Sequence, residues 1–96
     1  MTPRDAPSGR PRQVRLIGKP GCHLCDEARA VVAQECRRAG VELVEVSILD
    51  DPELHARFWD TIPVVQVDGE TVDQLRVDSA RLRALLSPGR RRRLLW

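Results

Sequence analysis

The sequence predicts a small α/β domain, in which a four-stranded mixed sheet is flanked by three helices in the order β-α-β-α-β-β-α. Two apolar runs, 14–18 and 41–48, enclose a helical pattern, and a crossover helix between two strands makes them parallel. A third run ends at Asp68-Gly69, a strong two-residue hairpin signal that pairs it with a fourth strand. Helices on both faces would bury such a sheet. A chain of 96 residues suffices for one core of this kind.

A short turn joins the first strand to the first helix. Val14 to Gly18 indicates a buried central strand, and Lys19-Pro20-Gly21 indicates the turn. From Cys22 to about Ala39 apolar residues recur at helical spacing, and Gly40 supplies the helix end.

The helical spacing of these apolar residues also indicates on which faces of the helix the polar residues and the third cysteine lie. Arg29, Glu35 and Arg37 are expected mostly on other faces of this helix. Cys36 continues the apolar stripe, so we expect a buried structural thiol. Eleven residues of helix separate it from Cys25, an axial distance of about 16 Å that a disulfide cannot bridge.

The second strand and second helix follow directly. Residues 41–48 alternate between apolar and polar side chains, as in a strand. Asp50-Asp51-Pro52-Glu53 then predicts a helix start, with an acidic cap and proline at the first helical position. This helix is expected to run to about Trp59.

The last elements are a hairpin and a helix. Residues 61–67 predict the third strand with Pro63 at its first position, where proline is tolerated. Residues 70–75 predict the fourth strand. Asp78 is expected to cap a last helix through Leu86, with Leu82, Leu85 and Leu86 facing inward and Pro88-Gly89 ending it.

Charge and composition divide the chain into three segments. We expect a disordered N-terminal segment (1–13), one domain (14–87) and a basic C-terminal tail (88–96). The domain carries nine basic and thirteen acidic residues, or −4, whereas the two ends carry seven basic and one acidic, or +6, giving +2 in all.

Several classes of partner are not expected. No apolar stretch approaches the roughly 20 residues that span a membrane, and the N-terminal segment lacks the apolar centre of a secretory signal. We therefore expect a cytoplasmic protein without a membrane partner. The block Arg90–Arg93 lacks interleaved aromatic residues, so no nucleic-acid partner is expected either. The chain is expected to be a monomer.

The chemistry of the chain is concentrated in Cys22 and Cys25. Two thiols separated by two residues at a helix start are close enough to form a small disulfide ring. The first lies where unpaired backbone N–H groups and the helix dipole favour a thiolate. The spacing thus indicates thiol–disulfide exchange, with Cys22 as the nucleophile and Cys25 as the resolving thiol.

Other interpretations of the pair remain open. Structural zinc requires four ligands, and the chain offers one pair plus the scattered Cys36, His23 and His55, so no metal site is expected within it. A second interpretation is that Cys22 and Cys25 supply half of a metal or iron–sulfur site that is shared between two chains. A third alternative is a non-catalytic module that binds a partner with little turnover.

Three features resemble the glutaredoxin branch of the thioredoxin fold over about residues 14–87. They are Cys22-His23-Leu24-Cys25 opening the first helix, Lys19 three residues ahead of Cys22, and Thr61-Ile62-Pro63. Within this family the chain resembles the small bacterial glutaredoxin-like proteins.

The resemblance implies a dithiol oxidoreductase that reduces protein or mixed disulfides and binds no metal or organic cofactor. Lys19 and His23 would tune the Cys22 thiolate. Thr61, Ile62 and Pro63 would form the substrate site, with a cis bond before Pro63 and the Ile62 backbone groups free to pair with an extended substrate.

The sequence also departs from the family pattern. Glutaredoxins commonly carry a Gly-Gly pair and an acidic residue after the hairpin, which help to hold glutathione. Residues 72–79 contain no such pair, and only Asp78 matches the acidic role. The expected electron donor is therefore an external low-molecular-weight thiol, glutathione or another, or a thioredoxin-type reductant.

Overall fold

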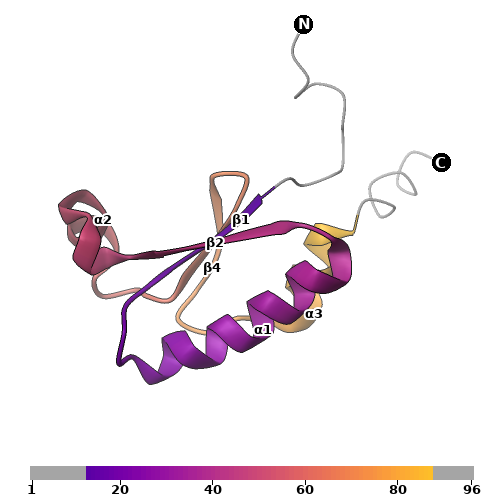
Figure 1. Ribbon diagram of the computed structural model, residues 1–96, viewed down its shortest axis with the longest axis horizontal. Coiled ribbons are helices and arrows are strands. Elements are labelled where there is room, and N and C mark those ends of the chain that lie inside the picture. The colour runs from indigo at the N-terminus through magenta and orange to yellow at the C-terminus, as the bar shows by residue number, and fades with distance from the viewer. Residues whose placement is uncertain (1–12, 88–96) are drawn as a thin grey trace, which may run out of the picture.

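Figure 1 shows the computed structural model, which describes residues 13–87. Its elements are β1 (Gln13–Gly18), α1 (His23–Ala39), β2 (Glu42–Ser47), the 3₁₀ turn η2 (Ile48–Asp50), α2 (Pro52–Phe58), β3 (Val64–Val67), β4 (Glu70–Gln74) and α3 (Ser79–Leu86). Of the two expected end segments, only Gln13 is described, and it begins β1. The rest of 1–13 and the basic tail lie outside the described residues.

The four strands form one mixed sheet in the order β2-β1-β3-β4. β1 pairs in parallel with β2, with Leu16 opposite Glu45, and antiparallel with β3, with Leu16 opposite Val65. The hairpin between β3 and β4 turns at Asp68 (φ 49°) and Gly69 (φ 90°), both in the left-handed region that a tight hairpin turn requires. The predicted fold class is confirmed.

Helices cover the two faces of the sheet unequally. Figure 1 shows α1 and α3 lying together on one side and α2 apart from them. Val14, Leu16 and Val65 pack with α1 and α3 in one core cluster. Ile17 and Val64 face the other way and pack with Phe58 of α2 in a second cluster. Because side chains alternate along a strand, β1 supplies both cores.

Element boundaries differ from the prediction around Pro63. The third strand was expected to have Pro63 at its first position, and β3 begins one residue later, at Val64. The backbone N–H groups of Thr61 and Ile62 both donate to the Phe58 carbonyl, at 2.9 and 3.1 Å, and Pro63 has no N–H. Residues 61–63 therefore form a loop between α2 and β3.

An ion pair joins α1 to α3. Glu35 was expected on a polar face, yet its side chain is only 3% exposed. Arg83 of α3 donates to both of its carboxylate oxygens, at 3.0 and 2.9 Å, and Arg38 lies 3.4 Å away. Hydrogen bonds from Arg83 hold the pKa of Glu35 below its usual range, against the opposing effect of burial. The expectation that Leu85 faces inward is also wrong, because Leu85 is 40% exposed.

Removal of Arg83 should make the fold less stable at neutral pH and less sensitive to acid. Above about pH 4.5, the usual pKa of the carboxyl, the lowered pKa of Glu35 stabilises the folded state, and this contribution is lost as the pH falls. We expect Arg83→Met to lower the melting temperature at pH 7, with a difference from wild type that shrinks towards pH 3. Arg81→Met, at an exposed arginine of the same helix, is the control. Equal melting curves for the two variants at pH 7 would contradict the prediction.

Candidate active site

The sulfur of Cys22 caps the first helix. Cys22 has extended backbone angles (φ −103°, ψ 117°), and its Sγ accepts a hydrogen bond from the Cys25 backbone N–H at 3.3 Å. Gly21 ahead of it has a φ of 76°, which lets the turn bring Cys22 to this position. A helix cap favours a negatively charged atom, because it meets unpaired N–H groups and the positive end of the helix dipole. Cys22 is partly exposed, so a substrate can approach this sulfur.

Cys25 lies one turn further along and has the opposite environment. It is 2% exposed and packs with Ile17, Phe58 and Ile62. Burial, followed by the hydrogen bond with Cys22, raises the pKa of the Cys25 thiol from 9.0 to about 11, and a hydrogen bond from the Lys19 backbone offsets part of this. At neutral pH Cys25 is therefore a protonated thiol beside an accessible sulfur.

Alkylation should reveal this difference between the thiols. At pH 8 the thiolate fraction of a group with a pKa of about 11 is about 100-fold smaller than at a pKa of 9.0. Burial also raises the pKa of Cys36. We expect iodoacetamide to modify Cys22 first in the folded, reduced protein, and the Cys25 rate to climb up to about pH 11. Peptide mass spectrometry measures each rate, and the unfolded chain should show three similar rates. Equal rates for Cys22 and Cys25 in the folded protein at pH 8 would contradict the prediction.

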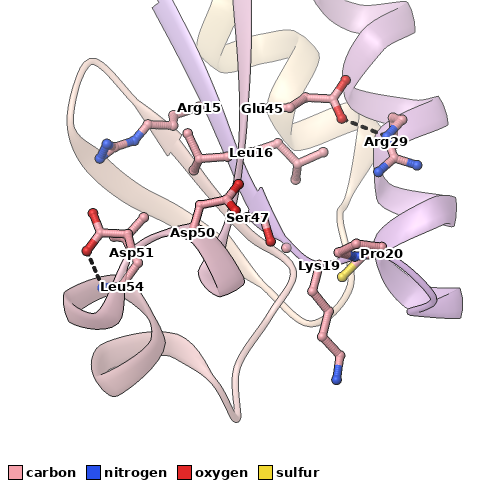
Figure 2. Close-up of a pocket in the computed structure, with 13 residues that line it drawn as sticks. Arg15, Leu16, Lys19, Pro20, Arg29, Glu45, Ser47, Asp50, Asp51 and Leu54 are labelled. Atoms are coloured by element: carbon pink, nitrogen blue, oxygen red, sulfur yellow. Dashed lines mark hydrogen bonds and ion pairs between the residues drawn. The ribbon is translucent and has the colours of Figure 1, made fainter.

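The two expected tuning residues are close to the pair in the chain, but among the described residues neither side chain has a recorded contact with a cysteine sulfur. Lys19 is exposed, and Figure 2 shows its side chain extending away from the strands. His23 is also exposed, and its Nε2 lies 3.0 Å from Glu27 Oε2, one helical turn further on. The described partner of His23 is thus a carboxylate and not a sulfur.

The loop of Thr61, Ile62 and Pro63 reaches the cysteines through Ile62. Ile62 is buried in the same apolar cluster as Cys25, and the partly buried Cys22 packs against this cluster. The Ile62–Pro63 peptide bond is cis, and the Pro63 carbonyl accepts from the Leu75 N–H at 2.8 Å. The expectation that both Ile62 backbone groups are free is wrong, because its N–H donates to the Phe58 carbonyl. The Thr61 hydroxyl likewise lies 3.4 Å from that carbonyl.

Asp78 caps α3, as expected from the sequence. Its carboxylate accepts from the Arg81 N–H at 3.1 Å, and its own N–H donates to Asp73 at 3.0 Å. Within residues 13–87 none of its hydrogen bonds involves a residue around Cys22. The carboxylate is exposed and keeps one oxygen outside the cap.

A cavity of about 540 Å³ opens beside Cys25, and the sequence analysis did not anticipate it. Figure 2 shows that β1, β2 and the start of α2 line it, with Arg15 and Asp51 on one side and the ion pair Arg29–Glu45 (2.7 Å) on the other. Its volume lies in the range of small-molecule sites. No local sequence motif predicts this cavity, because its walls come from segments that are far apart in the chain.

The described part of the chain holds neither a cluster of metal-ligating side chains nor a helix that could span a membrane. Among residues 13–87 no three or more His, Cys, Asp or Glu side chains gather around one position, so a metal held at Cys22 and Cys25 would need further ligands from elsewhere. No helix of this segment has the length and apolar character to cross a membrane.

Comparison with known proteins identifies relatives over most of the chain. The model of the Glutaredoxin-like domain (DUF836) matches residues 13–87. Uncharacterized protein Rv0508 of Mycobacterium tuberculosis is 31% identical over 77 residues, which cover 75% of this chain and 79% of that protein. The solution structure of protein Ne2328 from Nitrosomonas europaea superposes with a TM-score of 0.69 at 27% identity, covering 83% of this chain and 96% of that one.

The fold is shared more widely. Thioredoxin 1 from Thermosipho africanus superposes with a TM-score of 0.57 at 10% identity, covering 86% of this chain and 93% of that one. At that identity the likeness concerns the fold alone. The predicted thioredoxin-like arrangement of strands and helices is confirmed.

Proposed function

We propose, from the premise that this chain belongs to the glutaredoxin-like domain family (DUF836), that it is a thiol–disulfide oxidoreductase that reduces protein or mixed disulfides. The observation that carries the proposal is the contrast between its paired cysteines. Cys22 presents an accessible sulfur at a helix cap, and Cys25 holds a buried, protonated thiol one turn away. Disulfide exchange with internal release requires one attacking and one resolving sulfur.

In the first step the Cys22 thiolate attacks one sulfur of a substrate disulfide. A bond forms between Cys22 and that sulfur, the substrate S–S bond breaks, and the other substrate sulfur leaves as a thiolate that takes a proton from solvent. The helix cap supports this step, because the Cys25 N–H stabilises a negative charge on the attacking sulfur.

In the second step Cys25 loses its proton to solvent and attacks the Cys22 sulfur. The bond between Cys22 and the substrate breaks, the reduced substrate leaves as a thiolate, and a Cys22–Cys25 disulfide remains. Two electrons have passed to the substrate, so an external thiol donor must reduce the pair again. The raised pKa of Cys25 keeps this thiol from competing with Cys22 in the first step.

The surrounding residues have proposed roles in binding and tuning. Thr61, Ile62 and Pro63 form the substrate edge, where the Ile62 N–H already has a partner and its carbonyl is the group offered to an extended substrate. Lys19 adds positive charge near the Cys22 thiolate, and His23 does so when it is protonated. Asp78, exposed at the start of α3, contacts a polar group of a small thiol.

We further propose a monomeric cytoplasmic protein without a resident metal or organic cofactor. The donor is glutathione, another low-molecular-weight thiol or a thioredoxin-type reductant. Partners are then disulfide-bearing proteins or small thiols, without nucleic acid or membrane.

The test is whether the full chain reduces model disulfides. Insulin and 2-hydroxyethyl disulfide are offered to the wild-type protein, with the glutathione system and the thioredoxin system supplied in turn as donors. We expect turnover with at least one donor, and unchanged turnover in Cys36→Ala. Rates equal to the uncatalysed reaction with every donor would reject the proposal. A coloured or zinc-containing protein that does not turn over would favour the inter-chain metal site instead.

A further inference from the structure

Gly18, the last residue of β1, lies directly against the resolving cysteine. A Cβ built on Gly18 would stand 2.9 Å from Cys25 Sγ and 3.3 Å from Cys25 Cβ. Separations under 3.0 Å essentially never occur for real Cβ atoms. The sulfur of Cys25 therefore occupies the space that any larger residue at position 18 would fill.

Space, and not backbone conformation, explains this glycine. Gly21, Gly40 and Gly69 have φ values of 76°, 71° and 90°, which other residues rarely adopt, and a Cβ on any of them would meet no atom within 4 Å. Gly18 is a regular strand residue paired with Ser47, and it shows no positive φ. Among these four glycines, only Gly18 has another atom in contact with the position that a Cβ would occupy.

We propose that Gly18 is a positioning residue, which sets the place of the Cys25 sulfur for attack on the mixed disulfide at Cys22. The inference rests on the proposed function. Both ends of the contact are buried, so the sulfur has few other positions. With a methyl group at position 18, Cys25 would have to rotate its sulfur away from the wall of β1. The sulfur would then leave the position from which it reaches Cys22.

The affected step is the second one. Cys25 gives up its proton, forms the bond to Cys22 and displaces the substrate thiolate. A ring closure of this kind depends on the alignment of the two sulfurs, and a misplacement of about 1 Å can slow such a step about 100-fold. The Cys25 sulfur forms no covalent bond in the first step, and the backbone N–H of Cys25 still donates to Cys22, so this step should change little.

The two steps can be followed separately with 5,5′-dithiobis(2-nitrobenzoate). Attack by Cys22 releases one nitrothiophenolate, and closure by Cys25 releases the second. With Cys36→Ala as the common background, we expect Gly18→Ala to keep the first rate within about threefold and to slow the second at least about tenfold. Gly40→Ala is the matched control: it makes the same chemical change at the other end of α1, where a Cβ would meet no atom within 4 Å, and both of its rates should equal those of the background.

A second measurement covers the case in which Gly18→Ala folds poorly. If the clash is with the sulfur, removing that sulfur should relieve it, so Gly18→Ala should lower the melting temperature less in a Cys25→Ala background than beside Cys25. An equal loss in both backgrounds would overturn the inference, and so would an unchanged second rate in Gly18→Ala. Absence of any second release from the Gly18-containing background would instead reject the proposed function, so the two failures are distinguishable.

Discussion

Cys22→Ser is expected to lower the rate of disulfide reduction at least about 1,000-fold, because a serine hydroxyl is not ionised at neutral pH and is a far weaker nucleophile. The fold should survive the change. Serine is itself a preferred helix cap, so its oxygen can accept the Cys25 N–H in place of the sulfur. Steady-state reduction of 2-hydroxyethyl disulfide with the effective donor measures the rate, and the melting temperature measures stability.

The control for this prediction is Cys36→Ala, which removes a thiol that lies in the apolar core and not at the helix start. It should retain wild-type turnover. Retention of more than a tenth of the wild-type rate by Cys22→Ser would mean that another group attacks the substrate. If the protein is instead a partner-binding module without turnover, the wild type and Cys22→Ser should both show the same rate, close to background.

Cys25→Ser is expected to stop the reaction halfway. Cys22 would still attack, but no second sulfur would displace the captured substrate, so one mixed disulfide per chain should accumulate. Because intramolecular closure is favoured by a high effective concentration, we expect its loss to slow release of a protein substrate at least about 100-fold. Intact mass spectrometry after exposure to a disulfide peptide measures the trapped adduct.

The matching control is Cys22→Ser, which should trap no adduct. Formation of a stable adduct at Cys36 in either variant, or prompt release from Cys25→Ser without added thiol, would contradict the assigned order of attack. A small thiol donor that acts directly on the adduct should restore release from Cys25→Ser, since it supplies the missing sulfur from solution.

Those parts of the fold that depend on local signals were predictable from the sequence. The turn before Cys22, the hairpin at Asp68-Gly69 and the cap at Asp78 each rest on residues within a few positions of one another. The crossover between the two parallel strands followed from the helix between them.

What the sequence did not reveal depends on partners far along the chain. Glu35 follows the polar pattern of its own helix, and Arg83, which donates to both of its carboxylate oxygens, lies 48 residues later. The Ile62 N–H is a different case, because its partner, the Phe58 carbonyl, lies only four residues earlier, where the end of α2 leads into the loop.

The candidate site was also only partly predictable. The cysteine spacing located the pair, and the Cys22 sulfur lies at the helix cap. Gly18, at the end of a strand, contacts Cys25, which lies seven residues later in a helix. The sequence around a glycine does not show which atom occupies the space that a side chain would fill. The cavity beside Cys25 is lined by residues of β1, β2 and α2 together, so no single segment of the sequence predicts it.

The most direct test of the central claim is to map the disulfides of the protein after gentle oxidation. We expect a single internal bond that joins Cys22 to Cys25, leaves Cys36 as a free thiol, and disappears when the physiological donor is added. A protein in which both cysteines stay reduced, or in which Cys22 bonds only to another chain, would contradict that claim.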